Sequence, residues 1–404
     1  MRTILFVDDE PNVLSGLRRT LRQFRGQWAL LFANGAEEAV SILRKRKLDV
    51  IVTDMQMPRI TGAQLLKYVG DKYPDIVRVM LSGQSDEESL QLSVSRTHQY
   101  FTKPCDPVEL FQAVSRSCAL RDRLSNEKLK ALISQTRSLP SAPQIYAKVV
   151  DELQSTDACL RTIADLISQD VAMSTKLLQL VNSSFFSLKR RVESPAQAAA
   201  LLGLNVLRPV VLTVGIFSQF DVKNESLFSM GAFSDHAMAV GQVAEMIAED
   251  LEAPKQMVDD SQMAGFVHDV GQLLLASRMP EIYEQMHRDV VELQHDLYES
   301  EDQYFGTTHL LVGAHLLALW GLPQPIVEAV AFHAKPREME TEEFNPLVAV
   351  HVANVLVNET TLQNPIEVDT QLDLEWLDGL GLADHVDRWR DRVRVMVSKG
   401  GRHE

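Results

Sequence analysis

Five polar residues within the first 103 positions could together bind a divalent cation and a phosphoryl group. Asp8, Asp9 and Asp54 each follow an apolar run of the chain, and so do Ser82 and Lys103. Mg²⁺ prefers oxygen ligands and keeps several waters, so two or three carboxylates are enough to hold it. A carboxylate can also accept a phosphoryl group as an acyl phosphate, whose charge a nearby cation neutralises. These residue types therefore indicate magnesium-assisted phosphorylation of an aspartate.

The apolar runs before these residues have the composition of β-strands. They read TILFV, DVIVT, VRVML and QYFT, and helical patterns separate them. Strands that alternate with helices predict a doubly wound parallel α/β sheet, whose ligand site lies at the carboxyl ends of the strands. Asp54 ends the central run and is the predicted phosphoacceptor. Asp8 and Asp9 would hold the metal beside it. Lys103 would neutralise the phosphoryl oxygens, and Ser82 would donate a hydroxyl group.

Residues 1–122 resemble a two-component receiver domain. The motifs that carry this resemblance are VDDE at 7–10, TDMQMPRITG at 53–62, LSGQSD at 81–86 and FTKP at 101–104. The resemblance implies a five-stranded, flavodoxin-like sheet and phosphorylation of Asp54 by a sensor histidine kinase. It also implies that Mg²⁺ binds to Asp8, Asp9, Asp54 and the backbone carbonyl of Gln56.

The same resemblance assigns switch residues. Ser82 is expected to swing toward the phosphoryl group, and the ring of Tyr100 is expected to turn inward with it. Pro58 and Gly62 match the loop that follows the phosphorylated aspartate, and the Lys103–Pro104 peptide bond is expected to be cis.

Composition excludes several classes of protein. Lys plus Arg number 40 against 55 Asp plus Glu, a net charge of −15, which argues against a nucleic-acid surface and a transcription factor. Cys105, Cys118 and Cys159 are scattered, as expected for reduced thiols. No apolar run reaches the roughly 18 residues of a membrane helix, and the amino terminus enters a strand without a signal peptide. We therefore expect a cytoplasmic protein that binds neither membrane nor nucleic acid.

A helical connector is predicted after the receiver-like region. Residues 107–138 have the pattern of one long helix, of which 123–138 form the connector, and LPSAP at 139–143 marks a domain boundary. An ordinary helix is preferred over a coiled-coil seam because the apolar spacing is irregular. The seam residues would be Leu110, Val114, Leu120, Leu124, Leu129 and Leu132.

Residues 139–404 predict an all-α domain in which strand signals nearly vanish. Segments with a helical period include 146–154, 160–169, 173–184, 195–203, 207–220, 233–251, 257–277 and 309–321. Several histidines and one aspartate fall inside such segments, namely His236, His268, Asp269, His309 and His333. A His-Asp pair with further histidines from neighbouring helices is a ligand set for a divalent metal. Each of them, taken singly, is better explained as a buried or partly buried residue satisfied by hydrogen bonds.

This domain resembles the HD superfamily, and specifically the HDOD domain. LPSAPQIYAKVVDEL, LLQLVNSSFF, ALLGLNVLRPVVLT, HDVGQLLL, VGAHLLALWGLP and AVAFHAKP carry the resemblance. Compared with catalytic HD enzymes, Asn354 replaces a metal-binding aspartate, Gln272 replaces a phosphate-binding lysine, and Ala334 replaces a second histidine. No Gly-Tyr-Pro loop of the kind found in cyclic dinucleotide phosphodiesterases follows Ala334.

These departures predict a degenerate HD site with no catalytic residue and with weak or no metal binding. The sequence therefore predicts a response regulator whose HDOD domain acts on an unidentified downstream protein, and homodimer formation is left open. The alternative is a metal-dependent phosphodiesterase or phosphohydrolase that acts on a cyclic dinucleotide.

Overall fold

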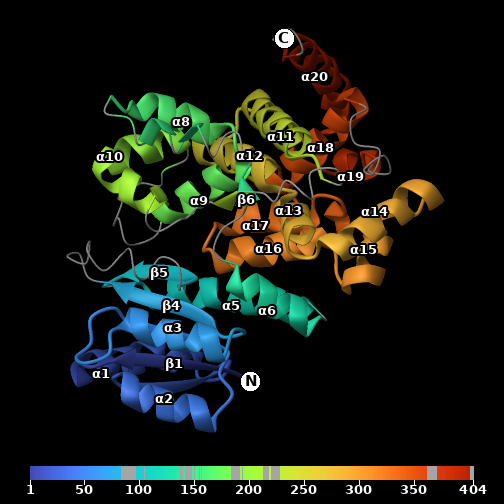
Figure 1. Cartoon of the computed structure of the whole chain (residues 1–404). Coiled ribbons are helices and arrows are strands. Elements are labelled where there is room, and N and C mark those ends of the chain that lie inside the picture. Colours follow the sequence, from blue (N-terminus) through green and yellow to red (C-terminus); the bar gives the residue numbers. More distant parts are fainter. Residues whose placement is uncertain are drawn as a thin grey trace.

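The structure is a computed structural model of the 404-residue chain. It describes residues 1–82, 97–103, 105–124, 126–136, 140–141, 148–149, 151–153, 155, 157–182, 192, 194–212, 218–219, 228–361 and 371–400. The amino-terminal part is an α/β domain, and the helices that follow lie together on one side of it (Figure 1).

The α/β domain contains a five-stranded parallel sheet, as the sequence predicts. Its strands are β1 (Arg2–Asp8), β2 (Trp28–Asn34), β3 (Val50–Asp54), β4 (Val77–Ser82) and β5 (Gln99–Thr102). They are arranged in the order β2-β1-β3-β4-β5, so that β3 is central. This is the flavodoxin-like order, with its ligand site beyond the carboxyl ends of β1 and β3.

Helices cover both faces of this sheet. They are α1 (Pro11–Thr20), the 3₁₀ helix η1 (Leu21–Phe24), α2 (Ala36–Lys45), α3 (Gly62–Lys72) and α5 (Pro107–Arg123). Side chains of β1 alternate between the faces: Ile4 and Phe6 pack with α1 and α5, whereas Leu5 and Val7 pack with α2 and α3. This alternation follows from the two-residue period of a strand.

The predicted long helix over 107–138 is wrong, because the structure has two helices there. Helix α5 ends at Arg123, Leu124 is extended, and α6 runs over Glu127–Gln135. The side chain of Asn126 accepts hydrogen bonds from the backbone N–H groups of Lys128 and Leu129, at 3.0 and 3.2 Å. Such a cap begins a new helix and explains the break. Of the predicted seam residues, Leu110, Val114, Leu124 and Leu129 are buried in the core of this chain, and Leu120 and Leu132 pack against it.

The remaining chain is helical. Its helices are α8 (Leu160–Ser168), α9 (Val171–Asn182), α10 (Pro195–Leu212), α11 (Met230–Asp250), α12 (Lys255–Val267), α13 (Val270–Arg278), α14 (Pro280–Leu293), α15 (Leu297–Phe305), α16 (His309–Leu319), α17 (Gln324–Phe332), η5 (Pro336–Glu338), α18 (Pro346–Thr361), α19 (Leu374–Gly379), η6 (Ala383–His385) and α20 (Val386–Gly400). The all-α prediction missed one short strand pair, β6 (Pro140–Ser141) with β7 (Ser218–Gln219). Strand β6 lies within the segment 139–143 that was predicted to be a domain boundary. Strand β7 lies near the end of the segment 207–220 that was predicted to be helical.

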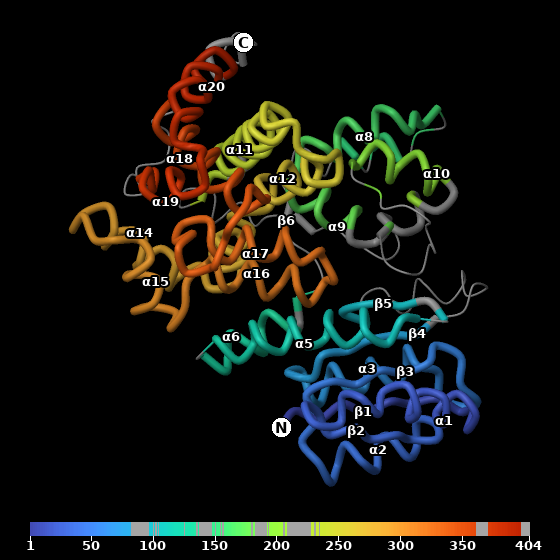
Figure 2. Tube along the Cα trace, turned by 180° about the vertical axis from the view of Figure 1, so that it is seen from behind, coloured from blue at the N-terminus to red at the C-terminus, as the bar shows by residue number. Residues whose placement is uncertain are grey.

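The two domains share one apolar core. Leu110, Val114 and Cys118 of α5 belong to the same buried cluster as Leu316 and Leu319 of α16. Both views place α5 beside the sheet, and α5 and α6 next to the helical domain that contains α16 (Figures 1 and 2). Among the residues that the structure describes, no helix is long and apolar enough to cross a membrane.

Candidate functional sites

The first site lies where β1, β3 and β5 end. The Lys103 ammonium is 2.7 Å from an oxygen of Asp8 and 2.6 Å from an oxygen of Asp54, and therefore bridges the two carboxylates. Asp8 is buried and also accepts the backbone N–H of Glu10 at 2.9 Å. Three residues from distant parts of the sequence are thus in direct contact, at the edge where the strand pattern places them.

Burial and charge act in opposite directions at this site. Burial raises the pKa of Asp54, the negative charge of Asp8 adds to the increase, and Lys103 only partly offsets it. For Lys103, burial lowers the pKa, but the two carboxylates outweigh burial and raise it. The lysine therefore stays cationic, as a residue that neutralises phosphoryl oxygens must.

The loop after β3 approaches the Asp54 backbone closely. The N–H of Gly62 donates to the carbonyl of Met55 at 2.9 Å. A Cβ atom on Gly62 would lie only 2.0 Å from the carbonyl oxygen of Asp54, so any side chain at this position would displace the loop. Thr61 then caps α3 with a reciprocal bond to Gln64.

The structure describes the other predicted residues of this site only in part. Asp9 directly follows β1 and is partly exposed, and Gln56 is exposed just after β3. Ser82 is the last residue of β4, and Tyr100 pairs with Met80 in the β4–β5 register, but their side chains lie outside the described part of the chain. The same is true of Pro104, so the predicted cis bond is not described.

The second site lies in the helical domain and gathers the predicted histidines around Asp269. The Nε2 atom of His268 is 3.1 Å from Asp269 Oδ2, and those of His309 and His333 are 3.3 and 3.6 Å from Asp269 Oδ1. The Nε2 atom of His236 lies 3.0 Å from Asn354 Oδ1 instead. Two groups could hold a metal ion: His236 with His268 and Asp269, and Asp269 with His309 and His333.

The predicted position of these residues inside helices is wrong for most of them. The expected helix over 257–277 is interrupted, since His268 follows the last residue of α12 and Asp269 precedes α13. His333 follows α17, whereas His309, the first residue of α16, and His236, within α11, do lie in helices as predicted. The break allows α13 to approach α16 closely: a Cβ atom on Gly271 would lie 2.0 Å from the carbonyl oxygen of His309.

Glu301 belongs to this site, although no sequence pattern predicts it. Both of its carboxylate oxygens lie 2.8 Å from His309 Nδ1, and one of them accepts the His309 backbone N–H at 2.9 Å. Its side chain is fully buried. Burial lowers the pKa of His309, but Glu301 and Asp269 outweigh burial and raise it well above the usual value. Glu301 lies among exposed acidic residues of α15, and nothing in that pattern distinguishes it.

The residues that depart from catalytic HD enzymes lie around this cluster. Asn354 is buried in α18, and its Oδ1 atom also accepts a hydrogen bond from Asn358 at 3.2 Å. Gln272 is buried in α13, and Ala334 is partly exposed after α17. The pKa values of His236 and His333 are lowered to about 4 and about 3, mainly by burial, so both imidazoles are neutral at pH 7.

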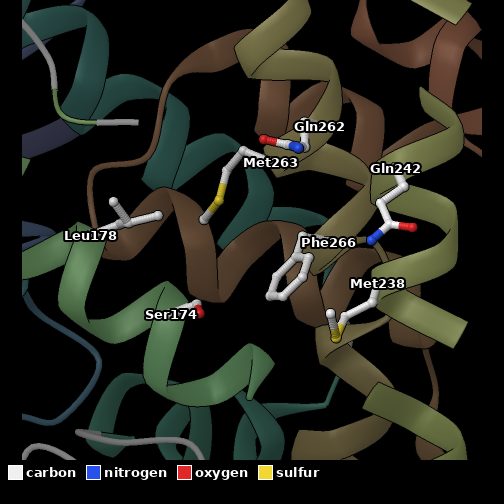
Figure 3. A pocket seen from close by; sticks show the side chains of 7 residues that line it. All are labelled: Ser174, Leu178, Met238, Gln242, Gln262, Met263 and Phe266. Carbon is white, nitrogen blue, oxygen red and sulfur yellow. The ribbon is translucent and has the colours of Figure 1, made fainter. Parts of the chain in front are cut away.

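A separate pocket of about 180 Å³ lies between α9, α11 and α12 (Figure 3). Its lining residues are Ser174, Leu178, Met238, Gln242, Gln262, Met263 and Phe266. None of them belongs to the histidine cluster. Ligand pockets usually measure about 300–1,000 Å³, so this pocket is small for a cyclic dinucleotide.

Comparison with known proteins identifies both domains. Residues 4–115 match the response regulator receiver domain, and residues 139–336 match the HDOD domain. The chain is a response regulator with an HDOD domain. Helices α18, α19 and α20, with Asn354, follow the matched HDOD segment.

Three similar proteins illustrate the extent of the likeness. An uncharacterised protein of Treponema pallidum is 26% identical over 268 residues, which cover 64% of this chain and 51% of the relative. The hydrogenase transcriptional regulatory protein HoxA of Cupriavidus necator is 36% identical over 117 residues, 28% of this chain and 24% of HoxA. This regulator therefore spans about half of the first relative and a quarter of the second. The crystal structure of the MmoQ response regulator from Methylococcus capsulatus has a TM-score of 0.47 and 24% identity, covering 64% of this chain and 98% of MmoQ.

The receiver and the HDOD domain meet at the carboxyl end of α16. The carbonyl oxygen of Ala318 accepts hydrogen bonds from Gln99 Nε2 of the receiver at 2.7 Å and from Ser117 Oγ at 3.0 Å. Gly321 has φ of +75°, a backbone conformation that closes α16 and brings the next turn against Gln99. Gln99 lies in β5, so this strand of the receiver itself contacts the HDOD domain.

Basic groups gather beside this contact. The Arg78 guanidinium donates to the carbonyl of Ser134 at 2.7 Å and lies 2.6 Å from His98 Nε2. Lys176 of α9 is buried, with its ammonium 4.3 Å from the centre of the Trp320 ring. Within the described part of the chain, no carboxylate forms an ion pair with Lys176.

Proposed function

We propose that this response regulator is phosphorylated on Asp54 by a sensor histidine kinase and that its HDOD domain signals through protein–protein contacts. The observation that carries the proposal is the Lys103 ammonium in contact with both Asp8 and Asp54. A phosphoacceptor needs such a fixed cation, because negative charge grows on the phosphoryl oxygens during transfer. The scattered free thiols agree with a cytoplasmic protein.

The donor set at the receiver site suits Mg²⁺. Asp8, Asp9, Asp54 and the Gln56 carbonyl offer only oxygen ligands, which hard cations prefer. Bound there, Mg²⁺ would supply charge neutralisation for the phosphoryl group. Asp54 would provide the attacking carboxylate oxygen, and Lys103 would hold a phosphoryl oxygen in place.

Phosphorylation would act on the domain contact through β5. Any movement of Ser82 or Tyr100 shifts the strand that carries Gln99, whose amide is bonded to Ala318. If the receiver has two packing arrangements that differ in free energy by a few kcal/mol, the charge of a phosphoryl group is enough to change their populations. Because the core is continuous across α5 and α16, a change at the receiver would be felt by the HDOD helices.

Small-angle scattering tests this coupling directly. Beryllofluoride with Mg²⁺ mimics the acyl phosphate, and we expect it to change the scattering curve of the full chain. The Asp54→Asn variant should give the same curve with and without the compound. Superimposable curves for wild type at saturating beryllofluoride would contradict the coupling.

The hydrogen bonds to Ala318 should contribute measurably to domain docking. Replacing Gln99 and Ser117 together with Ala removes both donors, at a cost of about 0.5–1.5 kcal/mol each. We expect faster amide hydrogen exchange over residues 316–322 in this double variant. Arg116→Ala is the matched control, because it removes an exposed contact at the same interface, to Gln324 at 3.2 Å. Equal exchange in both variants would show that these two bonds do not hold the domains together.

The alternative, a phosphodiesterase acting on a cyclic dinucleotide, is disfavoured by the chemistry of the cluster. Asn354 brings no charge to the metal-binding set, and Gln272 cannot neutralise a phosphoryl oxygen. We expect the full chain, with Mn²⁺, Fe²⁺ or Mg²⁺, to show no turnover of cyclic dinucleotides or phosphate esters above a protein-free blank. Turnover that disappears in His268→Ala would instead establish the enzyme.

A further inference from the structure

His98 is a buried histidine of the receiver, and its hydrogen bonds fix its protonation state. The Nδ1 atom of His98 accepts the backbone N–H of Arg78 at 3.1 Å, so this nitrogen carries an electron pair and no proton. The Nε2 atom then carries the single proton of the neutral ring. It donates this proton to the carbonyl oxygen of Ser134, near the end of α6, at 2.9 Å. Both nitrogens of the neutral imidazole are therefore satisfied.

A second proton on His98 would disrupt this arrangement. It would place an N–H group at Nδ1 against the backbone N–H of Arg78, where no hydrogen bond can form. It would also charge a ring whose Nε2 atom lies 2.6 Å from the Arg78 guanidinium. Burial lowers the pKa of His98 well below its usual value. Arg78, a charged His315 and Lys176 add to this decrease in pKa, and the bond to Ser134 only partly offsets it.

His315, on the HDOD side of the contact, is a second buried histidine. Within the part of the chain that the structure describes, neither of its ring nitrogens has a hydrogen-bond partner. It lies in α16, which packs against α5 and α6. The pKa of His315 is lowered to about 3, mainly by burial and further by Arg121 of α5 and Lys130 of α6, whereas Asp122 acts in the opposite direction. A proton on His315 would therefore be a buried charge without an acceptor.

The charged groups around the two histidines leave no carboxylate for a protonated ring. Asp122 is the one carboxylate among the groups named above, and it is half-exposed and bound to Arg2 at 2.7 Å and to Arg121 at 3.3 Å. Arg121 is also paired with Asp49 at 2.7 Å. Every other charged group that acts on the two rings is a cation. A proton taken up at this contact would add to an excess of positive charge.

We infer that the contact between the receiver and the HDOD domain is sensitive to protons, and that proton uptake by His98 and His315 separates the two domains. The docked form accommodates neither proton, whereas in the separated form both rings reach water. Acidification would thus open the same contact that phosphorylation is proposed to change. The inference requires neither Asp54 nor a kinase, so it can be tested apart from the proposed phosphorylation.

The direction of the pH dependence follows from which form binds the protons. In the separated form each imidazole is expected to regain a pKa near 6.5, the usual value for histidine. In the docked form both pKa values are lower. The contribution of these histidines to docking is therefore complete above about pH 7 and is lost as pH falls below about 6.5. Between pH 7.5 and 5.5 each histidine should lower the docking equilibrium constant about tenfold, and the two together about a hundredfold.

Amide hydrogen exchange of the full chain measures this equilibrium. The exchange rate over residues 316–322, at the carboxyl end of α16, is compared with the chemical exchange rate at each pH to give a protection factor. From pH 7.5 to 5.5 we expect this factor to fall about a hundredfold in wild type, and equally in Asp54→Asn. Protection in α2 (Ala36–Lys45), which covers the other face of the sheet from α5, should change little.

Variants that cannot take up the proton locate the effect. In His98→Gln the amide offers one acceptor and one donor for the same two bonds, and in His315→Leu an apolar side chain replaces the unpartnered ring. Each single variant should keep about a tenfold response, and the double variant should lose the response to within about twofold. His295→Ala removes an exposed histidine and is the control that should respond as wild type does. Circular dichroism at both pH values shows which variants fold, and either single variant is sufficient for the test.

Two results would overturn the inference. The first is a protection factor in wild type that changes by less than about threefold between the two pH values. The second is an equal fall in wild type and in a folded His98→Gln or His315→Leu variant, which would place the titrating group elsewhere in the chain.

Discussion

Replacing Asp54 with Asn is expected to abolish phosphorylation of the chain completely. Acetyl phosphate with Mg²⁺ should label wild type and leave Asp54→Asn unlabelled, as intact-protein mass spectrometry would show. The reason is chemical: the phosphoryl group is accepted by a carboxylate oxygen, and a neutral amide cannot form the acyl phosphate. Asp54 is the proposed acceptor because it ends the central strand β3 and lies 2.6 Å from the Lys103 ammonium.

Asp75→Asn is a suitable control for this experiment. Asp75 is an exposed aspartate of the same domain that precedes β4 and contacts none of the site residues described above. It should be labelled as wild type is. Equal labelling of wild type and Asp54→Asn would refute the assignment and move the phosphoacceptor to another residue.

The receiver site could be predicted from the sequence because the fold places it by a simple rule. Parallel strands bring their carboxyl ends to one edge, so apolar runs followed by polar residues predict both the sheet and the contact of Asp8, Asp54 and Lys103. The positions of the side chains of Ser82 and Tyr100 stay predictions.

The helical site followed no such rule. Helical periodicity predicts which face of a helix is buried, but not which helix ends meet. The break at His268–Asp269 and the approach of α13 to α16 at Gly271 depend on tertiary packing. Glu301 is an example of a residue that helical periodicity does not predict. It lies in α15 and contacts His309, which is eight positions further along the chain, after the end of that helix.

The domain contact was equally hidden, because its bonds join residues far apart in the chain. Gln99 and Ala318 are separated by 219 positions, and the acceptor is a backbone carbonyl, which every residue type provides. Instead of the single helix expected over 107–138, the structure has α5 and α6, and Asn126 caps the start of α6. Both helices pack on α16.

The second large effect is expected at Lys176, whose replacement by Met should stabilise the protein. The Lys176 side chain is only 4% exposed, and burial lowers its pKa from 10.5 to about 7. The pKa of His98 is likewise lowered mainly by burial, and the Lys176 charge lowers it further. A buried ammonium in such surroundings costs free energy, which the Trp320 ring offsets by only about 1–2 kcal/mol.

The sign of the pH dependence follows from the lowered pKa. Below pH 7 Lys176 is protonated in the folded and the unfolded chain, and the full cost of burying it is present. Between about pH 7 and 10.5 the unfolded chain binds the proton more tightly, so stability rises with pH. A shift of this size corresponds to roughly 3–5 kcal/mol. After the loss of the ring contact, we expect Lys176→Met to gain about 2–3 kcal/mol at pH 6 and little at pH 10.

Calorimetry of wild type and Lys176→Met at several pH values measures this difference. The variant should melt at a higher temperature than wild type at pH 6, and the two melting temperatures should converge as pH rises toward 10. Lys45→Met, which alters an exposed lysine of α2, should show no such convergence. A melting difference that does not depend on pH would mean that the Lys176 ammonium is not buried as a charge, and that the variant changes only apolar packing.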